Sequence, residues 1–594
     1  MKKFEIPIKE YEKDLETKSA KGKKKEILDL FKHHNKLRSE EDFRVIKENL
    51  HFACREGNLE LIKIYLNESI VNDSETLELK IDETNRTASI SRIAYSSEKV
   101  IFPRTYQHGS SEYLITSLIG NGYDLRTLKF SEDSAVKTIY RNSLYLRLEE
   151  IYFPSSLKEL KKGWCYGAKN LTKITISPKI DHFAFKNNKY LIGKSDENND
   201  EFDILLFASR DIDEIVIPSS IKIISSYAFK DCDKLTKVEF ETNSNLQIIE
   251  SYAFDCYNLT EFKIPPNSNL QKIGKFSFCC FKIKEICFPE SLKELKEGWC
   301  SDLLNLTKIT ISPKNDHFVY KDGKYLIGKS GENNNEFDIL LFASRDINEI
   351  VIPSSIKIIS SYAFQNCDKL TKVEFETNSD LQRIGNNAFS YSNVKEIVIP
   401  SKVSKISTEA FHECHNLTKV EIFPKSNLQK IGKNAFSYSN INRIFIPSKV
   451  SIICEEAFYN CAYLSSVEFE ADSNLQTIEN HSFSYTNINR IIIPPKVSKI
   501  GERAFAMCKY LNKIDFATNS NLQTIEKNAF CISKSKGIII PPKLSKIGEQ
   551  AFSILLQIIE ISEDSILESI PLSAFSQDQD IIIMIPLSKK KLII

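Results

Sequence analysis

The segment His412-Glu413-Cys414-His415 is the one run of this 594-residue chain in which several metal-ligand residue types are neighbours. A structural zinc site needs four ligands that converge on one point. Cys414, however, recurs in register with Cys367 and Cys461, and His415 takes the place of Asp368 in that register. The pattern favours chance adjacency over a metal site, and we expect neither a metal nor another cofactor.

Fourteen cysteines could also form disulfides, but their spacing argues against it. Five of them follow a recurring phenylalanine by three residues, and alternate repeats carry serine or threonine there. Strands stack at roughly 4.8 Å, so cysteines two coils apart lie about 10 Å apart, beyond the roughly 7 Å between Cα atoms that a disulfide allows. We expect buried, free thiols at Cys232, Cys367, Cys414, Cys461 and Cys508.

Catalytic motifs are missing from the sequence. It contains no G-x-G-x-x-G, P-loop, G-x-S-x-G or H-E-x-x-H pattern, so no residue supports an enzyme. The 80 basic and 79 acidic side chains give no net field that would attract nucleic acid. The N-terminus has no apolar signal-peptide core, and the apolar run 581–587 is far shorter than the roughly 20 residues of a transmembrane helix.

The elements that position these residues belong to an internal repeat. One phenylalanine ends each repeat motif. From Phe364 to Phe552 successive copies are alternately 25 and 22 residues apart, so that coils come in pairs of 47, and the last step, to Phe575, is 23 residues. The copies are Phe364, Phe389, Phe411, Phe436, Phe458, Phe483, Phe505, Phe530, Phe552 and Phe575, with Phe229, Phe254 and Phe278 before them. A single coil cannot bury its own apolar side, so we expect the coils to stack and the phenylalanines to meet.

Residues 417–436 represent one repeat. The alternation in its first six residues predicts a half-buried strand with Leu417, Val420 and Ile422 inward, and parallel strands of successive coils are expected to form one long sheet. A proline such as Pro447 follows the strand, where a ladder N–H can be spared. Glycines such as Gly385 are expected to mark a second tight bend.

A block of the chain is duplicated 135 residues apart. Residues 202–229 and 337–364 differ only at Asp213 and Asn348. Each copy also carries two apolar stretches around an Asn/Asp/Glu-rich turn, which predicts β-hairpin insertions near 186–210 and 321–345 that project from the stack.

The pattern L-x-x-I-x-x-x-A-F-x-x-C-x-x-L-x-x-I-x-I-P, found between Leu114 and Pro586, resembles the BspA-like leucine-rich repeat. The resemblance implies a curved, mainly β solenoid with a parallel sheet, short helical or turn segments and no catalytic activity. It also implies a surface antigen or an adhesion or binding protein.

The first part of the chain departs from the repeat. Residues 41–66 have helical spacing broken at Gly57-Asn58, and they are similar to the helix-turn-helix of an ankyrin repeat. Residues 1–75 are therefore predicted to be a helical, ankyrin-like cap or a separate docking module. Residues 76–113 would be an entry region with a strand at Leu77–Ile81, and residues 114–594 the solenoid.

Outward positions of the predicted strands carry acidic and apolar residues in alternation. One interpretation is a protein-binding face, because apolar patches rimmed by charge mark interaction surfaces. The other is that β-branched residues suit strands and charges pair across them. The candidate partner-binding residues are Glu374, Val398, Glu421, Phe445, Glu468, Ile492, Asp515 and Ile539.

Two functions remain open. The family resemblance favours a cell-surface antigen or adhesin with a host or matrix protein as its partner. The missing signal peptide and transmembrane helix favour a cytosolic protein-interaction scaffold of the same fold. Asn-Leu-Thr sequences would be glycosylation acceptors if the chain is secreted, and otherwise turn asparagines; they begin at Asn170, Asn258, Asn305 and Asn416.

Overall fold

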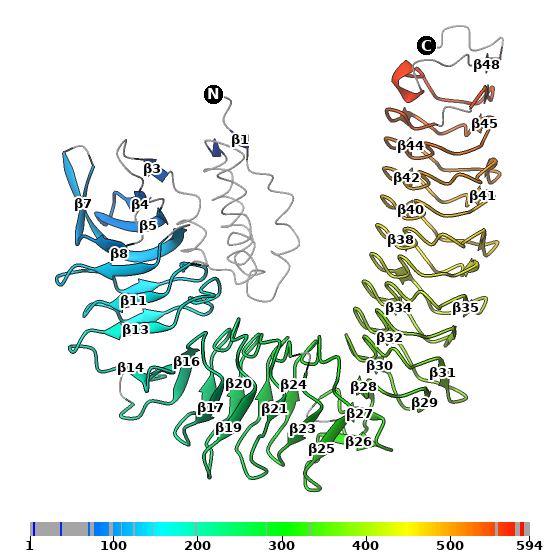
Figure 1. Ribbon diagram of the computed structural model, residues 1–594. Helices are drawn as coiled ribbons and strands as arrows, with labels where there is room; N and C mark the ends of the chain where they lie inside the picture. Colours follow the sequence, from blue (N-terminus) through cyan, green and yellow to red (C-terminus); the bar gives the residue numbers. More distant parts are fainter. Residues whose placement is uncertain are drawn as a thin grey trace. The chain divides into compact units, whose positions relative to one another are not determined.

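The computed structural model describes most of the chain as two compact units of β-coils (Figure 1), residues 1–259 with 268–277 and residues 260–267 with 278–594. The described residues are 4–5, 36–37, 69–71, 77–93, 99–108, 110–122, 125–144, 147–196, 199–280, 282–331, 334–552, 556–575 and 582–586. Among them, the 3₁₀ turn η3 (Leu572–Ala574) is the only helical element. The ankyrin-like helices predicted at 41–66 lie outside the described residues.

The first unit begins with antiparallel strands and continues with parallel coils. The strand predicted at Leu77–Ile81 is confirmed as β4 (Leu77–Asp82), which pairs antiparallel with β3 (Ser69–Val71) and β5 (Thr87–Ile93). Strand β8 (Ser111–Gly122) then joins β5 in parallel and β7 (Thr105–His108) antiparallel. The parallel coils of this unit follow with β6 (Lys99–Phe102), β9 (Thr127–Phe130), β11 (Glu150–Phe153) and β13 (Lys173–Ile176), and with β10 (Thr138–Ile139) and β12 (Glu159–Leu160).

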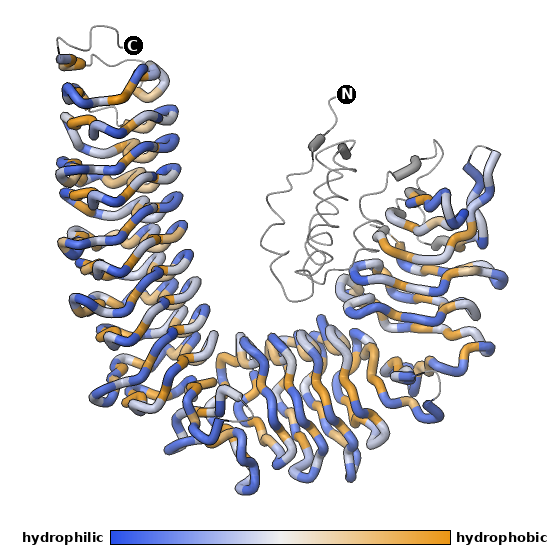
Figure 2. Tube along the Cα trace, turned by 180° about the vertical axis from the view of Figure 1, so that it is seen from behind, coloured by the Kyte–Doolittle hydropathy of each residue, from blue (hydrophilic) through white to orange (hydrophobic). Residues whose placement is uncertain are grey.

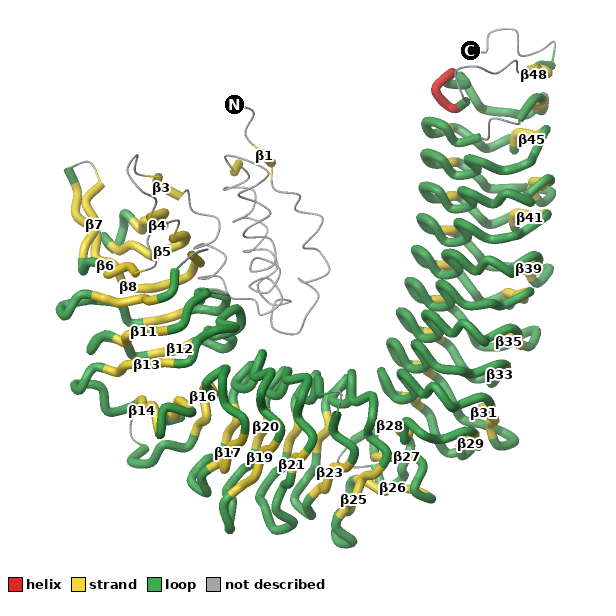
Figure 3. Tube along the Cα trace, in the orientation of Figure 1, coloured by secondary structure: helices red, strands yellow, loops and turns green. Residues whose placement is uncertain are grey.

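In the second unit each regular coil contributes one four-residue strand and one two-residue strand, joined by turns (Figure 3). The predicted parallel pairing is confirmed, but the prediction of one long sheet from the four-residue strands is wrong. They fall into several short sheets. The first contains β29 (Glu349–Ile352), β31 (Lys372–Phe375), β33 (Glu396–Ile399) and β35 (Lys419–Ile422). Two further sheets are pairs, β37 (Arg443–Ile446) with β39 (Ser466–Phe469) and β41 (Arg490–Ile493) with β43 (Lys513–Phe516), and another contains β45 (Gly537–Ile540), β47 (Ile558–Ile561) and β48 (Ile582–Met584).

The continuous sheet of this unit is built instead from the two-residue strands. It follows the order of the chain because each L-x-x-I segment hydrogen-bonds only to the coils before and after it. Its strands are β30 (Ile358–Ile359), β32 (Arg383–Ile384), β34 (Lys405–Ile406), β36 (Lys430–Ile431), β38 (Ile452–Ile453), β40 (Thr477–Ile478), β42 (Lys499–Ile500), β44 (Thr524–Ile525) and β46 (Lys546–Ile547).

Buried phenylalanines form a stack inside the second unit, here called the phenylalanine ladder: Phe364, Phe389, Phe411, Phe436, Phe458, Phe483, Phe505, Phe530, Phe552 and Phe575. The rings of Phe389 and Phe411 lie 5.0 Å apart at 3° between planes, and those of Phe411 and Phe436 lie 5.1 Å apart at 2°. The N–H of Phe389 also donates to the Ala410 carbonyl of the next coil at 2.8 Å. Figure 2 shows hydrophobic residues recurring from coil to coil along this stack. The dry aromatic column predicted from the 22/25-residue spacing is thus confirmed, and each buried ring stabilises the stack by roughly 1.5–3 kcal/mol.

Strand ends follow the sequence pattern. The inward residues Leu417, Val420 and Ile422 are buried, and β37 ends at Ile446, directly before Pro447. Gly385 has a different role from the predicted bend: a Cβ there would lie 2.5 Å from the backbone nitrogen of Ser361 in the preceding coil. Glycine at this position lets two coils approach closely and does not serve a special φ angle, while Glu479 and Glu526 hold the equivalent position in later coils.

The two insertions contain antiparallel strands that continue into the solenoid. In the first copy β14 (Phe183–Lys186), β15 (Tyr190–Gly193) and β16 (Ile204–Ala208) pair antiparallel, and β16 then pairs in parallel with β18 (Ile223–Ile224) of the next coil. The second copy repeats this order with β26 (Phe318–Lys321), β27 (Tyr325–Gly328) and β28 (Ile339–Ala343) before β30. The insertions therefore extend the sheet of two-residue strands, whereas we expected them to project from the stack.

A buried arginine fixes each insertion, which the sequence pattern did not indicate. Arg210 is 5% exposed, and its guanidinium donates to the carbonyl oxygens of Ala168 at 3.1 Å and Ala228 at 3.0 Å. It also lies over the ring of Phe207. Arg345 repeats these contacts in the second copy with Leu303 and Ala363. Each arginine thus links carbonyls from both sides of the insertion through hydrogen bonds that its charge strengthens.

Candidate interaction surface

The outward residues of the four-residue strands bring acidic and apolar side chains side by side. In register, Val351 lies opposite Glu374 and Phe445 lies opposite Glu468. The same kind of pair recurs at Val398–Glu421, Ile492–Asp515 and Ile539–Glu560. Coils of two lengths alternate along the chain, and the acidic and the apolar residues alternate with them from strand to strand.

The predicted strip is solvent-facing, although unevenly. The exposed fractions of the Val398, Ile492 and Ile539 side chains are 42%, 48% and 60%. Glu374 and Glu468 are exposed, while Glu421, Asp515 and Phe445 are half-buried. Phe445 is less exposed than Val398, Ile492 and Ile539.

Neighbouring cations neutralise several of the acids. Lys372 lies 2.8 Å from the Glu374 carboxylate, Lys419 lies 3.3 Å from Glu421, and Arg490 lies 2.7 Å from Asp515. Part of the charge pattern is therefore pairing on the sheet surface, as the second interpretation of the strip required. These exposed pairs each contribute roughly 0–1 kcal/mol. Strand preference accounts for the β-branched residues Val398, Ile492 and Ile539 under the same interpretation, but not for Phe445.

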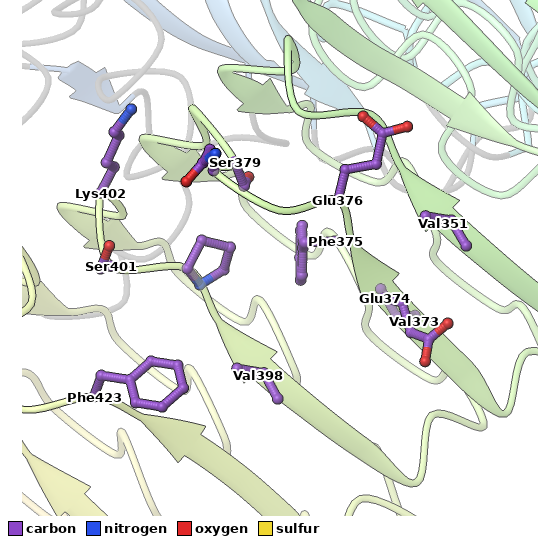
Figure 4. A pocket seen from close by; sticks show the side chains of 12 residues that line it. Val351, Val373, Glu374, Phe375, Glu376, Ser379, Val398, Ser401, Lys402 and Phe423 are labelled. Atoms are coloured by element: carbon purple, nitrogen blue, oxygen red, sulfur yellow. The ribbon is translucent and has the colours of Figure 1, made fainter.

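A first hollow of about 590 Å³ opens over β31 (Figure 4). The ring of Phe375 lies between Val351 on one side and Val398 on the other, and Phe423 lies beyond Val398. The remaining lining residues are Val373, Glu374, Glu376, Asn378, Ser379, Pro400, Ser401 and Lys402. The hollow exists because two strands with apolar side chains flank one that carries an acid.

A second hollow of about 530 Å³ lies over β39. Its lining repeats that of the first hollow 94 residues later, that is, after two 47-residue pairs: Phe445 replaces Val351, Ile492 replaces Val398 and Phe469 replaces Phe375. The other lining residues are Ser466, Val467, Glu468, Glu470, Ala471, Asn489, Arg490, Pro494, Pro495 and Ala517. The second hollow lacks a counterpart of Phe423, because Ala517 stands there.

Each hollow has a carboxylate at its edge, Glu376 or Glu470, whose lowered pKa keeps it charged. Backbone and hydroxyl hydrogen bonds from Ser354 lower the pKa of Glu376. The backbone N–H of Ser448 likewise lowers the pKa of Glu470. Each hollow thus combines an apolar floor with one fixed carboxylate at its edge.

Sequence reasoning selected five of the residues that line these hollows, namely Glu374, Val398, Phe445, Glu468 and Ile492, and missed others. Val351 continues the alternation one coil before the predicted strip began. Val216 holds the same strand position in the first unit and is 52% exposed. Phe423, which is 45% exposed, could have been found because alternate repeats place their phenylalanine one residue earlier.

The cluster at residues 412–415 does not converge on one point, although His412 Nε2 and His415 Nε2 lie 3.6 and 3.4 Å from the Glu413 carboxylate. Cys414 Sγ points inward and donates to the Phe389 carbonyl at 3.0 Å, whereas His412 Nδ1 lies 2.6 Å from Ser437 Oγ. His415 Nδ1 lies 3.1 Å from the Tyr438 carbonyl oxygen. Within the described ranges no group of three or more His, Cys, Asp and Glu side chains is placed to hold a metal ion.

All thirteen cysteines that the structure describes are free. Thiols of the predicted column alternate with hydroxyls: Ser439 Oγ lies 3.5 Å from Cys461 Sγ, and Thr486 Oγ1 lies 3.3 Å from Cys508 Sγ. The prediction of buried, unpaired thiols is confirmed for this column. Among the described residues no helix has the length and hydropathy to cross a membrane.

These features define a β-solenoid repeat protein with a surface of repeated shallow hollows. The model of the BspA type leucine rich repeat region matches residues 109–192, 202–321, 336–465 and 452–582. The chain therefore belongs to the BspA type leucine rich repeat family. The match begins at residue 109 and does not cover the segment predicted to be ankyrin-like.

Several solved structures are similar to this chain at low identity. A leucine rich cell surface protein from Faecalibacterium prausnitzii is 19% identical over 76% of this chain and 95% of its own, with a TM-score of 0.35. A leucine-rich repeat protein from Bacteroides ovatus is 18% identical over 87% and 100%, with a TM-score of 0.34. The pneumococcal vaccine antigen PcpA is 16% identical over 88% and 99%, with a TM-score of 0.29. None of the curated proteins matches the chain.

Proposed function

We propose that this chain is a non-catalytic binding protein and that the first and second hollows receive apolar side chains of one protein partner. The observation that carries the proposal is the recurrence of the same apolar floor and carboxylate rim 94 residues apart. Exposed apolar side chains gathered in depressions and rimmed by charge are typical of interaction surfaces.

The spacing of the hollows limits the shape of the partner. Four coil steps separate β31 from β39, which at roughly 4.8 Å per step is about 19 Å. An extended segment that advances about 3.3 Å per residue covers this distance in about six residues. A single extended segment with apolar residues about six positions apart would therefore fill both hollows, with a cation near Glu376 or Glu470.

The test compares the proteins captured by four forms of the full chain: the parent, two double variants and a control variant. Val398→Asp with Phe423→Asp places charges in the first hollow, and Phe445→Asp with Ile492→Asp places them in the second. Val216→Asp is the matched control, because it makes the same change at the same strand position outside both hollows. We expect a partner that is captured by the parent chain and the control but lost from either double variant, with all variants unfolding at nearly the same temperature.

Loss of one hollow should weaken binding and loss of both should abolish it, because the two contacts act on one ligand. Equal capture by the parent chain and both hollow variants would contradict the proposal. Equal loss in the Val216→Asp control would show a nonspecific effect of added charge.

We also propose, from the family, that the chain acts as a surface antigen or adhesin with a host or matrix protein as partner. The alternative is a cytosolic scaffold that uses the same hollows. Labelling of intact cells with an impermeant reagent distinguishes them: surface exposure gives a labelled chain, and a cytosolic chain is labelled only after lysis.

A further inference from the structure

Three cations lie in register on adjacent two-residue strands of the second unit. Arg383 of β32 is the register partner of Lys405 of β34, which is the partner of Lys430 of β36. All three side chains are exposed. Like charges that face each other on neighbouring strands destabilise a sheet.

Nothing among the described residues neutralises this cationic triad: no ion pair joins any of the three to a carboxylate. Farther along the same sheet the pattern differs. There Thr524 separates Lys499 from Lys546, and Glu526 lies 3.2 Å from the first lysine and 3.5 Å from the second.

The residues that follow these strands explain why the triad lacks such an acid. Glu526 follows its strand's first residue by two positions, and the equivalent positions after Arg383, Lys405 and Lys430 are Gly385, Ser407 and Gly432. None of these three residues carries a carboxylate, so the cations remain available to a ligand.

We propose that the triad binds a sulfated polysaccharide laid along the stack of coils. The three charges form an exposed row spaced roughly 4.8 Å apart. An acidic peptide fits this row poorly, because side chains on one face of an extended strand recur only about every 6.6 Å. A linear sulfated glycan carries sulfates at several positions of each disaccharide, so its charges are not limited to one group at that spacing.

The experiment measures binding of size-defined heparin oligosaccharides to the full chain as a function of salt. The test variant is Arg383→Thr with Lys405→Thr and Lys430→Thr; the chain itself carries threonine at this strand position in Thr477 and Thr524. We expect binding to weaken at least about tenfold and the slope of log K against log salt to fall by roughly 2–3, as for other lost contacts with a polyanion.

A matched control removes the same number of charges at wider spacing. Lys449, Lys496 and Lys543 are exposed, lie two coils apart, and each donates to an asparagine side chain of the preceding coil. Their triple threonine variant should bind the oligosaccharide within about twofold of the parent chain. Equal loss in the control variant, or equal binding of desulfated oligosaccharide or poly-glutamate by the parent chain, would overturn the proposal.

Unfolding of the unliganded chain gives a second readout. Removal of mutual repulsion should raise the unfolding temperature of the triad variant at low salt, and the rise should shrink at high salt because exposed charges are screened. A triad variant that is less stable than its parent at low salt would show that the three cations do not destabilise the sheet by repulsion, and would also overturn the proposal.

Discussion

Individual thiols in the core depend on hydrogen bonds that cross from one coil to the next. Cys461 Sγ donates to the Phe436 carbonyl at 3.0 Å, and Cys508 Sγ donates to the Phe483 carbonyl at 3.2 Å. Burial raises the pKa of Cys414 and Cys461 to about 12 and that of Cys508 to about 11. The thiols therefore stay protonated and unreactive at neutral pH.

The raised thiol pKa values predict a specific loss of stability in alkali. Because the folded pKa lies above the unfolded value of about 9, this contribution is fully present below pH 9 and is lost as pH rises through 11–12. Replacement of Cys414, Cys461 and Cys508 by serine, the residue of alternate coils at Ser392 and Ser439, should make the fall in unfolding temperature between pH 9 and pH 11 shallower. Thermal unfolding under reducing conditions measures it, and parallel curves for parent and variant would contradict it.

At the scale of one residue, the sequence predicted what depends on burial alone. The cysteine column could be assigned because its spacing matches that of the ladder. Arg210 and Arg345 could not, because an isolated arginine looks like any surface charge until the interrupted coil exposes carbonyls around it. Phe423 was missed because its exposure results from a shift of one position against its neighbours in the stack.

Neighbouring coils approach closely at the glycines that follow the two-residue strands. A methyl group added at Gly385 would lie 2.5 Å from the Ser361 nitrogen, whereas the nearest atom to a methyl group added at Gly537 would be the Ile558 carbonyl oxygen at 3.7 Å. Comparing alanine substitutions at Gly385 and Gly537 therefore separates the effect of close coil packing from the effect of losing a glycine.

Gly385→Ala should destabilise the chain by about 1–3 kcal/mol, because the added methyl forces two coils apart. Gly537→Ala should be neutral or stabilise by up to about 1 kcal/mol, since it restricts the unfolded chain without a clash. Denaturant unfolding of both variants measures the difference. Similar free energies of unfolding would show that the coils do not limit this position.

The sequence predicted the elements better than their assembly. Alternation identified Leu417, Val420 and Ile422 as the inward side of a strand, since that pattern is local. The spacing between the backbones of successive coils decides which strands form the continuous sheet. That spacing favours pairing of the two-residue strands. The hollows depend on three neighbouring strands at once, so no single repeat contains the signal for them.

The stability of the second unit is approximately the sum of contributions from its coils and the interfaces between them, because each coil contacts only its neighbours. The pair of coils is the natural unit of this addition, since the 22- and 25-residue members alternate along the chain and the hollows recur on multiples of 47 residues.

Deletion of residues 391–437 should therefore leave a folded chain. It joins Ser390 to Tyr438 within two matching A-F-S-Y-S-N sequences and removes one pair of coils. We expect an unchanged far-ultraviolet circular dichroism signal per residue and a fall of only a few degrees in the unfolding temperature. A deletion of 36 residues from the same start should abolish the cooperative unfolding transition, because the phenylalanines on the two sides of the junction would no longer stack. Equal behaviour of the two deletions would contradict stacking by pairs of coils.

The phenylalanine ladder also sets how the second unit responds to tension. Force applied along the stack passes through each rung in turn, because every junction joins a stacked ring contact, 4.6–6.3 Å between centroids, to an N–H and carbonyl pair. Rupture then proceeds from an end as a series of nearly equal events, and each pair of coils releases 47 residues, or about 160 Å of extended chain. A stack built in this way yields gradually under shear and can rewind when the load is removed.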